Sequence, residues 1–95
     1  MRPELKGGIA AISRAGRDKG RTYVVLCELD ADFVMVCDGG SRPMDRPKKK
    51  RRKHLLSTRH EMQDFASRLE GKTLRDQEIR SFIERLNDLN PTDLA

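Results

Sequence analysis

The stretch AISRAGRDKGRTYVV, residues 11–25, places a glycine-containing turn between two apolar segments. Gly16 and Gly20 lie four residues apart in this turn. Four cationic side chains surround them: Arg14, Arg17, Lys19 and Arg21. Glycine adopts positive φ without a clash and lets another backbone approach closely, so paired glycines suit a tight turn or a surface that touches a ligand. The charge around them indicates an anionic ligand.

The segments around this turn have the composition of β-strands. RTYVVLCEL, residues 21–29, and FVMVCDG, residues 33–39, alternate and are rich in aromatic and β-branched residues, and GGIAAIS, residues 7–13, is a short apolar run. DAD at 30–32 forms one turn, and DGGS at 38–41 supplies the positive φ of a tight hairpin turn. We therefore predict two adjacent hairpins.

A proline-containing segment and a basic run follow the hairpins. Pro43 and Pro47 keep SRPMDRP, residues 41–47, extended and exclude a central strand, because proline cannot donate to a ladder. This segment is predicted to be an edge strand or an irregular arm. The basic run consists of six cations followed by a histidine: Lys48, Lys49, Lys50, Arg51, Arg52, Lys53 and His54.

From Thr58 the apolar period changes from two towards 3.6, which predicts helices. Thr58 with Glu61 fits a capping box, and Gly71 is a suitable residue just past a helix end. The apolar stripe of this first helix is Met62, Phe65, Ala66 and Leu69. The sequence therefore predicts a short amphipathic helix between residues 58 and 71.

A second helix is predicted by the same signals. Thr73 with Asp76 offers another capping box, and Asn90-Pro91 supplies the stop. Its apolar stripe is Ile79, Phe82, Ile83 and Leu86. Helices this short are not stable alone, so we expect them to pack on each other, on the β part or on a partner.

Composition limits the class of protein. A chain of 95 residues is one domain with one modest core, which makes a large catalytic cleft unexpected. No apolar run is long enough to span a bilayer, and the N-terminus lacks the pattern of a signal peptide, so a cytoplasmic protein is expected.

Cys27 and Cys37 lie in apolar runs and are expected to be reduced and buried, without a disulfide or metal role.

Charge is distributed unevenly along the chain. Residues 1–60 hold 15 Lys and Arg against 7 Asp and Glu, and residues 61–95 hold 5 against 8, so +8 and −3 add to the net charge of +5. This asymmetry favours an acidic partner such as nucleic acid for the first part. No nucleophile–base pair, P-loop or metal-ligand spacing is present, so we expect no enzyme, no cofactor and no small-molecule substrate.

Residues 9–29, IAAISRAGRDKGRTYVVLCEL, resemble a KOW motif, in which a strand leads through a basic glycine loop into a second strand of an SH3-like barrel. The continuation FVMVCDGGSRPMDRPKKKRRKHL, residues 33–55, is similar to the eukaryotic-type large-subunit ribosomal protein fourteen family and its small bacterial relatives. The resemblance covers residues 8–56 well and residues 71–86 loosely. Gly40 adds a residue at the hairpin turn, and the second basic cluster is heavier than in that pattern.

The resemblance implies a small SH3-like β-barrel with a basic arm over residues 1–57, a helical hairpin over residues 58–95, and an RNA-binding protein of the ribosomal large subunit. The charge pattern supports this independently, because Lys and Arg neutralise phosphates and release counterions. The residues expected at the RNA are Arg14, Gly16, Arg17, Lys19, Gly20, Arg21 and residues 48–54. We expect phosphate contacts that give affinity and position, with RNA shape supplying selectivity.

Each of these signals has an alternative. The two glycines also satisfy turn geometry alone, and the basic run is equally typical of a nuclear import signal or a patch for anionic lipid. Tyr23 suits either core packing or base stacking, and His54 either contacts phosphate or ends a strand. His60 is expected at the surface near the first helix. The alternative function is a protein-binding adaptor, or a transcription-associated KOW module, acting through the helices at residues 58–90.

Overall fold

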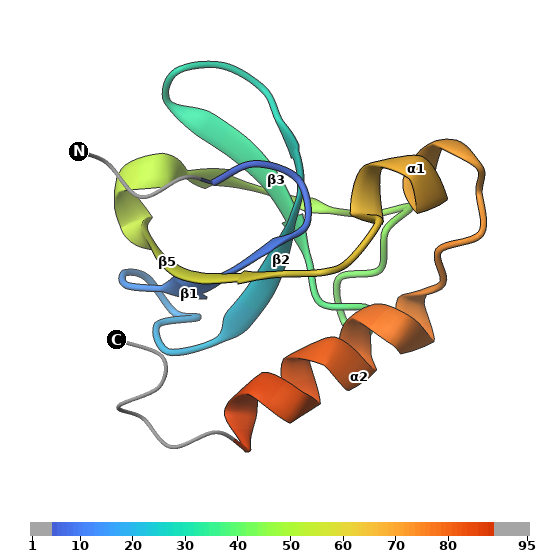
Figure 1. Cartoon of the computed structure of the whole chain (residues 1–95). Coiled ribbons are helices and arrows are strands. Elements are labelled where there is room, and N and C mark those ends of the chain that lie inside the picture. Colours follow the sequence, from blue (N-terminus) through green and yellow to red (C-terminus); the bar gives the residue numbers. More distant parts are fainter. Residues whose placement is uncertain (1–4, 89–95) are drawn as a thin grey trace.

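The computed structural model describes residues 5–88 and contains a five-stranded antiparallel sheet with two helices after it (Figure 1). The strands are β1 (Ile9–Ser13), β2 (Thr22–Glu28), β3 (Phe33–Cys37), β4 (Lys48–Arg51) and β5 (Leu55–Glu61). A 3₁₀ turn, η1 (Arg52–His54), precedes β5, and the helices are α1 (Phe65–Glu70) and α2 (Asp76–Asn87). A mainly β fold with a helical C-terminal part is thus confirmed.

The sheet has the order β4-β3-β2-β1-β5. The predicted hairpin through residues 30–32 is confirmed as β2–β3, and β1 and β2, the strand pair that the resemblance to a KOW motif implies, also pair antiparallel. At the second turn, Asp30 Oδ1 accepts hydrogen bonds from the backbone N–H groups of Asp32 and Phe33, each at 2.8 Å. Within the described residues, β4 and β5 are the two edges of the sheet and η1 connects them, so hydrogen bonding does not close the sheet.

The DGGS segment forms a local turn and does not form a tight hairpin. Asp38 Oδ1 accepts hydrogen bonds from the N–H groups of Gly40 and Arg42 at 2.8 and 2.9 Å, and Gly39 has a φ of +76°. The chain then continues through the irregular residues 43–47 before β4 begins at Lys48. The proline-containing segment is therefore the irregular arm, and the basic run itself supplies the edge strand.

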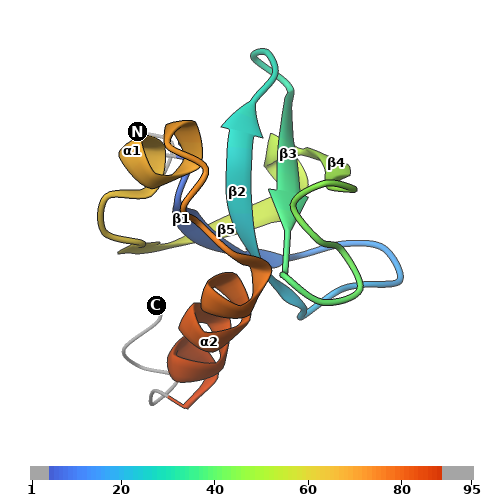
Figure 2. The ribbon, with the colours of Figure 1, turned by 90° about the vertical axis from the view of Figure 1, so that its right-hand side faces the viewer.

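Each face of the sheet has its own core. On the inner face, Tyr23 and Val25 of β2 pack with Val34 and Val36 of β3. On the outer face, Val24 and Cys37 pack against side chains from β5 onwards and both helices. This outer cluster also contains Met62, Phe65, Leu74, Ile79 and Ile83. Figure 2 shows α2 packed below one end of the sheet, so the helices pack on the β part of this same chain.

The prediction that the helical part begins at Thr58 is wrong. Residues 55–61 form β5, and Thr58 Oγ1 donates to the Ala10 carbonyl at 2.9 Å instead of capping a helix. The period of two was hidden by a bulge, because the β1–β5 register shifts between Ile9 and Ala11 and Arg59 adopts a φ of +65°. His60 consequently lies half-buried in β5.

Both helices are present, but neither has the predicted cap. α1 begins at Phe65 after Asp64, whose side chain makes no capping bond, and it ends before Gly71 as predicted. The N-cap of α2 is Arg75, and Asp76 Oδ1 accepts a hydrogen bond from the Met44 N–H at 2.8 Å, so the second capping box is also wrong. The Asn90-Pro91 stop lies outside the described residues.

The two cysteines differ in exposure. Cys37 is buried, as predicted, but Cys27 is exposed. A register shift between Val25 and Cys27 turns Cys27 to the outer face opposite Met35, so the expectation that both thiols are buried is wrong. Across residues 5–88, no helix has the length and apolar character needed to cross a membrane.

Candidate nucleic-acid interface

Asp18 ties the glycine loop to the basic strand. Its carboxylate accepts hydrogen bonds from Ser13 Oγ at 2.8 Å and from the Tyr23 hydroxyl at 2.8 Å. It also accepts from the ammonium groups of Lys48 at 3.0 Å and Lys50 at 3.1 Å. Only 9% of the Asp18 side chain is exposed. The loop at residues 14–21 and β4, which are far apart in the sequence, are therefore held together by one carboxylate.

This arrangement keeps Asp18 ionised. Burial alone raises the pKa of the Asp18 carboxyl, but the hydrogen bonds from Tyr23, Ser13, Lys48 and Lys50 outweigh it and hold that pKa well below its usual range. The pKa of the Tyr23 hydroxyl is raised by burial and by its bond to Asp18, so it stays a donor. The cluster is a permanent structural link at neutral pH.

The register of β4 explains which lysines face this cluster. Lys50 lies opposite Val34 and Lys48 opposite Val36, and both valines line the inner face. Successive side chains of a strand point to opposite faces, so Lys48 and Lys50 both point towards Asp18. Lys50 is only 8% exposed and its ammonium also donates to Ser13, so in this structure it serves the loop and is turned away from an external phosphate.

The other two residues of β4 lie on the outer face with Phe33. The Lys49 ammonium lies 4.3 Å from the centroid of the Phe33 ring, and the Arg51 guanidinium lies 4.9 Å from it. Both cations are exposed. The side chains of the basic run therefore alternate between the two faces over β4, and Phe33 is half-buried under two cations.

η1 is fixed to two turns of the sheet. Arg52 donates from Nε to the Asp30 carbonyl at 3.0 Å and from Nη2 to Glu28 Oε1 at 2.9 Å. The His54 carbonyl accepts a hydrogen bond from the Arg14 N–H at 2.7 Å, which is a second link between the glycine loop and the basic run. Lys53 is exposed and His54 is half-buried. In Figure 1 this turn and the glycine loop lie on the side of the sheet opposite α1.

The glycine loop carries its cations outward. Arg14, Arg17, Lys19 and Arg21 are all exposed, and Arg21 donates to Ser41 Oγ at 3.3 Å. Gly16 and Gly20 have φ values of +85° and +91°, so turn geometry requires both of them. A Cβ added at Gly20 would meet nothing within 4 Å. The close approach of a phosphate backbone to these glycines stays a prediction.

Sequence reasoning missed Asp18 and left two roles open for Tyr23. Tyr23 is 1% exposed, so core packing is confirmed for it and base stacking by it is wrong. An aspartate within a glycine turn has the same sequence signal as the turn-forming Asp30 and Asp38, and only the long-range bonds to β4 distinguish it. The alternation of side chains along β4 was the one sequence signal that Lys48 and Lys50 point to the same face of the sheet.

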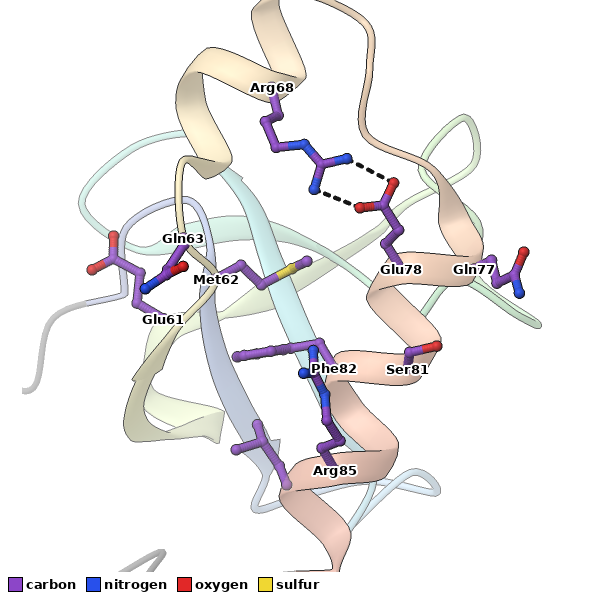
Figure 3. Close-up of a pocket in the computed structure, with 10 residues that line it drawn as sticks. Glu61, Met62, Gln63, Arg68, Gln77, Glu78, Ser81, Phe82 and Arg85 are labelled. Carbon is purple, nitrogen blue, oxygen red and sulfur yellow. Dashed lines mark hydrogen bonds and ion pairs between the residues drawn. The ribbon is translucent and has the colours of Figure 1, made fainter.

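The apolar stripe of α2 is already used within the chain. Ile79, Ile83 and Leu86 are at most 8% exposed, and Phe82 is half-buried. Beside them, a groove of about 590 Å³ runs between β5 and the helices (Figure 3). Its charged side chains are two acids and two bases: Glu61, Glu78, Arg68 and Arg85. The surface expected for an adaptor is therefore largely covered by the sheet.

No protein-family model matches the chain, and a search of curated proteins gives no match.

Proposed function

We propose that this chain is an RNA-binding, ribosome-associated protein of the KOW type that docks on structured, large-subunit ribosomal RNA through phosphate contacts. The carrying observation is that the two basic segments of the sequence meet in space around Asp18. A single ionised carboxylate there fixes the loop and β4 relative to each other. Cations held in place lose less conformational freedom when they bind phosphates than cations on a flexible arm.

The proposed contact set differs from the set of all basic residues. Side chains that are exposed on the loop, on β4 and on η1 contact phosphates: Arg14, Arg17, Lys19, Arg21, Lys49, Arg51 and Lys53. Lys48, Lys50 and Arg52 are bound to Asp18, Glu28 and Asp30 and position the others. Gly16 and Gly20 shape the loop, and His54 supplies the carbonyl that holds Arg14.

The architecture of the sheet supports an SH3-like barrel. Five short antiparallel strands carry an apolar cluster on one face, and η1 joins the two edge strands. In an SH3-like barrel such a sheet curls towards closure, which protects short edges from pairing with other chains. The loop at residues 14–21 and η1 then lie at one side of the barrel, where they present the cationic side chains to a folded RNA.

A pair of charge-matched variants tests the proposal. The loop–strand variant replaces three exposed cations of the contact set, two in the glycine loop and one in η1, directly after β4: Arg17→Gln, Lys19→Gln and Lys53→Gln. The helix variant replaces three exposed cations of the helical part: Lys72→Gln, Arg75→Gln and Arg85→Gln. Each lowers the net charge from +5 by three, to +2. The two variants therefore differ in the place of the lost charge and not in its amount.

Sedimentation of the tagged full chain through a sucrose gradient gives the readout. We expect the wild type and the helix variant to travel with the large ribosomal subunit at low salt, and the loop–strand variant to remain at the top. A salt wash should release the wild type, because phosphate contacts weaken with salt. The proposal is contradicted if the wild type stays at the top of the gradient at every salt concentration.

A further inference from the structure

A second concave site opens beside the basic surface. Leu5, Leu55, Ala31 and Ser57 form its walls, and three cationic side chains line it as well: Arg14, Arg52 and Lys53. Its volume is about 490 Å³, within the range of about 300–1,000 Å³ that is usual for small-molecule sites. The residues come from the segment before β1, the glycine loop, the β2–β3 turn, η1 and β5.

The walls combine an apolar floor with a cationic rim. Leu5 and Leu55 belong to the inner core cluster and are each 6% exposed, so a flat apolar group laid on them would extend the core of the sheet. Arg14 and Lys53 are exposed at the rim. A ligand with one flat apolar part and one anionic part fits this division.

The balance of charge makes this site selective for anions. Arg52 is the only lining cation for which the described residues show a carboxylate partner, Glu28, at 2.9 Å. Among residues 5–88, no acidic side chain lines the site. The groove beside α2, in contrast, is lined by equal numbers of acids and bases. Charge thus favours a phosphate at the site formed by Leu5 and Leu55 and not in the groove beside α2.

From these features we infer that the site holds one unpaired nucleotide of the bound RNA. Its base lies on Leu5 and Leu55, and its phosphate lies between Arg14 and Lys53. The inference rests on the proposed function and deepens it, because it gives the protein a preference for RNA in which a base is free to leave the helix. Phosphate contacts alone give no such preference.

Two single variants separate the site from the general basic surface. Arg14→Gln and Arg17→Gln remove the same charge from exposed positions of the same loop, but only Arg14 lines the site. The link from the Arg14 N–H to the His54 carbonyl is made by the backbone and survives the change. Binding of the full chain is measured on two labelled RNA hairpins whose strands are joined by a non-nucleotide linker, one fully paired and one with a single unpaired adenosine.

We expect the wild type to prefer the hairpin with the unpaired adenosine by about fivefold or more, because burial of about 40 Å² of the apolar surface of the base corresponds to roughly that ratio. Arg14→Gln should lose this preference, and Arg17→Gln should weaken both hairpins equally and keep it. Equal binding of the two hairpins by the wild type, or loss of the preference in both variants, overturns the inference and leaves the proposed function standing. If neither hairpin binds at low salt, both fail.

A titration with mononucleotides tests the same site without RNA. Adenosine monophosphate should shift the NMR signals of the Leu5 and Leu55 methyl groups, and inorganic phosphate or adenosine alone should shift them less. Arg14→Gln should weaken the nucleotide and Arg17→Gln should not. Equal shifts with phosphate alone, or no shift of these methyl groups, contradict a nucleotide site.

Discussion

Replacement of Asp18 by Asn tests the link between the glycine loop and β4. The amide keeps the shape of the carboxylate but removes the charge that pairs with Lys50, whose side chain is 9% exposed. Removal of one partner of a buried ion pair destabilises a protein by about 3–5 kcal/mol, because the other charge is left buried without compensation. The Asn oxygen still accepts one of the bonds from Ser13 and Tyr23, so we expect the lower end, ~3 kcal/mol. That is a large part of the ~5–15 kcal/mol total of a small domain.

Urea unfolding followed by circular dichroism measures the effect. In a Lys50→Met background the buried ammonium is absent, so Asp18→Asn should destabilise the protein less by at least ~1 kcal/mol. Glu28→Gln serves as the control, because its pair with Arg52 involves a carboxylate that is 51% exposed and should contribute less than ~1 kcal/mol. If Asp18→Asn unfolds at the same urea concentration as the wild type, or if the double variant shows simple additivity, the loop is not held as described.

Three further predictions follow from single contacts. The folded-state pKa of Asp18 is depressed, so the ionised carboxylate stabilises the fold above its unfolded-state pKa of 3.8. At pH values below about 4, the free energy of unfolding should therefore decrease as the pH is lowered. Urea unfolding repeated over pH should show a smaller decrease for Asp18→Asn. Gly39 has a φ of +76°, and the Cβ of a Gly39→Ala variant would clash with the carbonyl oxygen of the first residue of α2, whereas the Cβ of Gly20→Ala meets open space. Gly39→Ala should therefore lower the melting temperature clearly more than Gly20→Ala, and equal shifts would contradict this packing. Burial raises the pKa of the Cys37 thiol to about 12 while Cys27 is exposed, so a thiol reagent should modify one cysteine in the folded protein and both in urea, and rapid modification of both before unfolding would refute the burial.

The sequence was sufficient to predict those parts of the structure that depend on residues close together in the chain. The β2–β3 hairpin follows from turn chemistry at Asp30, whose side chain accepts two backbone N–H groups of its own turn. The stripe of α2 has the period of a helix, and Ile79 and Ile83 are buried by the sheet. These signals are local, so they survive in a single sequence.

The sequence predictions fail where contacts with a distant segment of the chain determine the local structure. The bulge at Arg59 interrupts the alternation of β5, so a strand had the appearance of the start of a helix at Thr58. The importance of Asp18 depends on Lys50, 32 residues later, and the direction of the Lys50 side chain depends on its register with Val34. No pattern within a short window contains this information, so the sequence could not separate Lys48 and Lys50, which bind Asp18, from the exposed cations of the run.

The most direct test of the central claim is the salt dependence of RNA binding by the loop–strand and helix variants, measured by fluorescence anisotropy with one labelled structured RNA. Each phosphate contact contributes about 0.7–0.9 to the slope of log affinity against log salt, so loss of three contacts should lower the slope by about 2–3. Extrapolated from 1 M salt to about 0.15 M, three contacts at about 0.7–0.9 each give a loss of affinity of about 50–170-fold for the loop–strand variant. The helix variant, with the same net charge, should keep the wild-type slope. Equal slopes and equal affinities for the two variants would contradict a phosphate-binding surface at the glycine loop and η1.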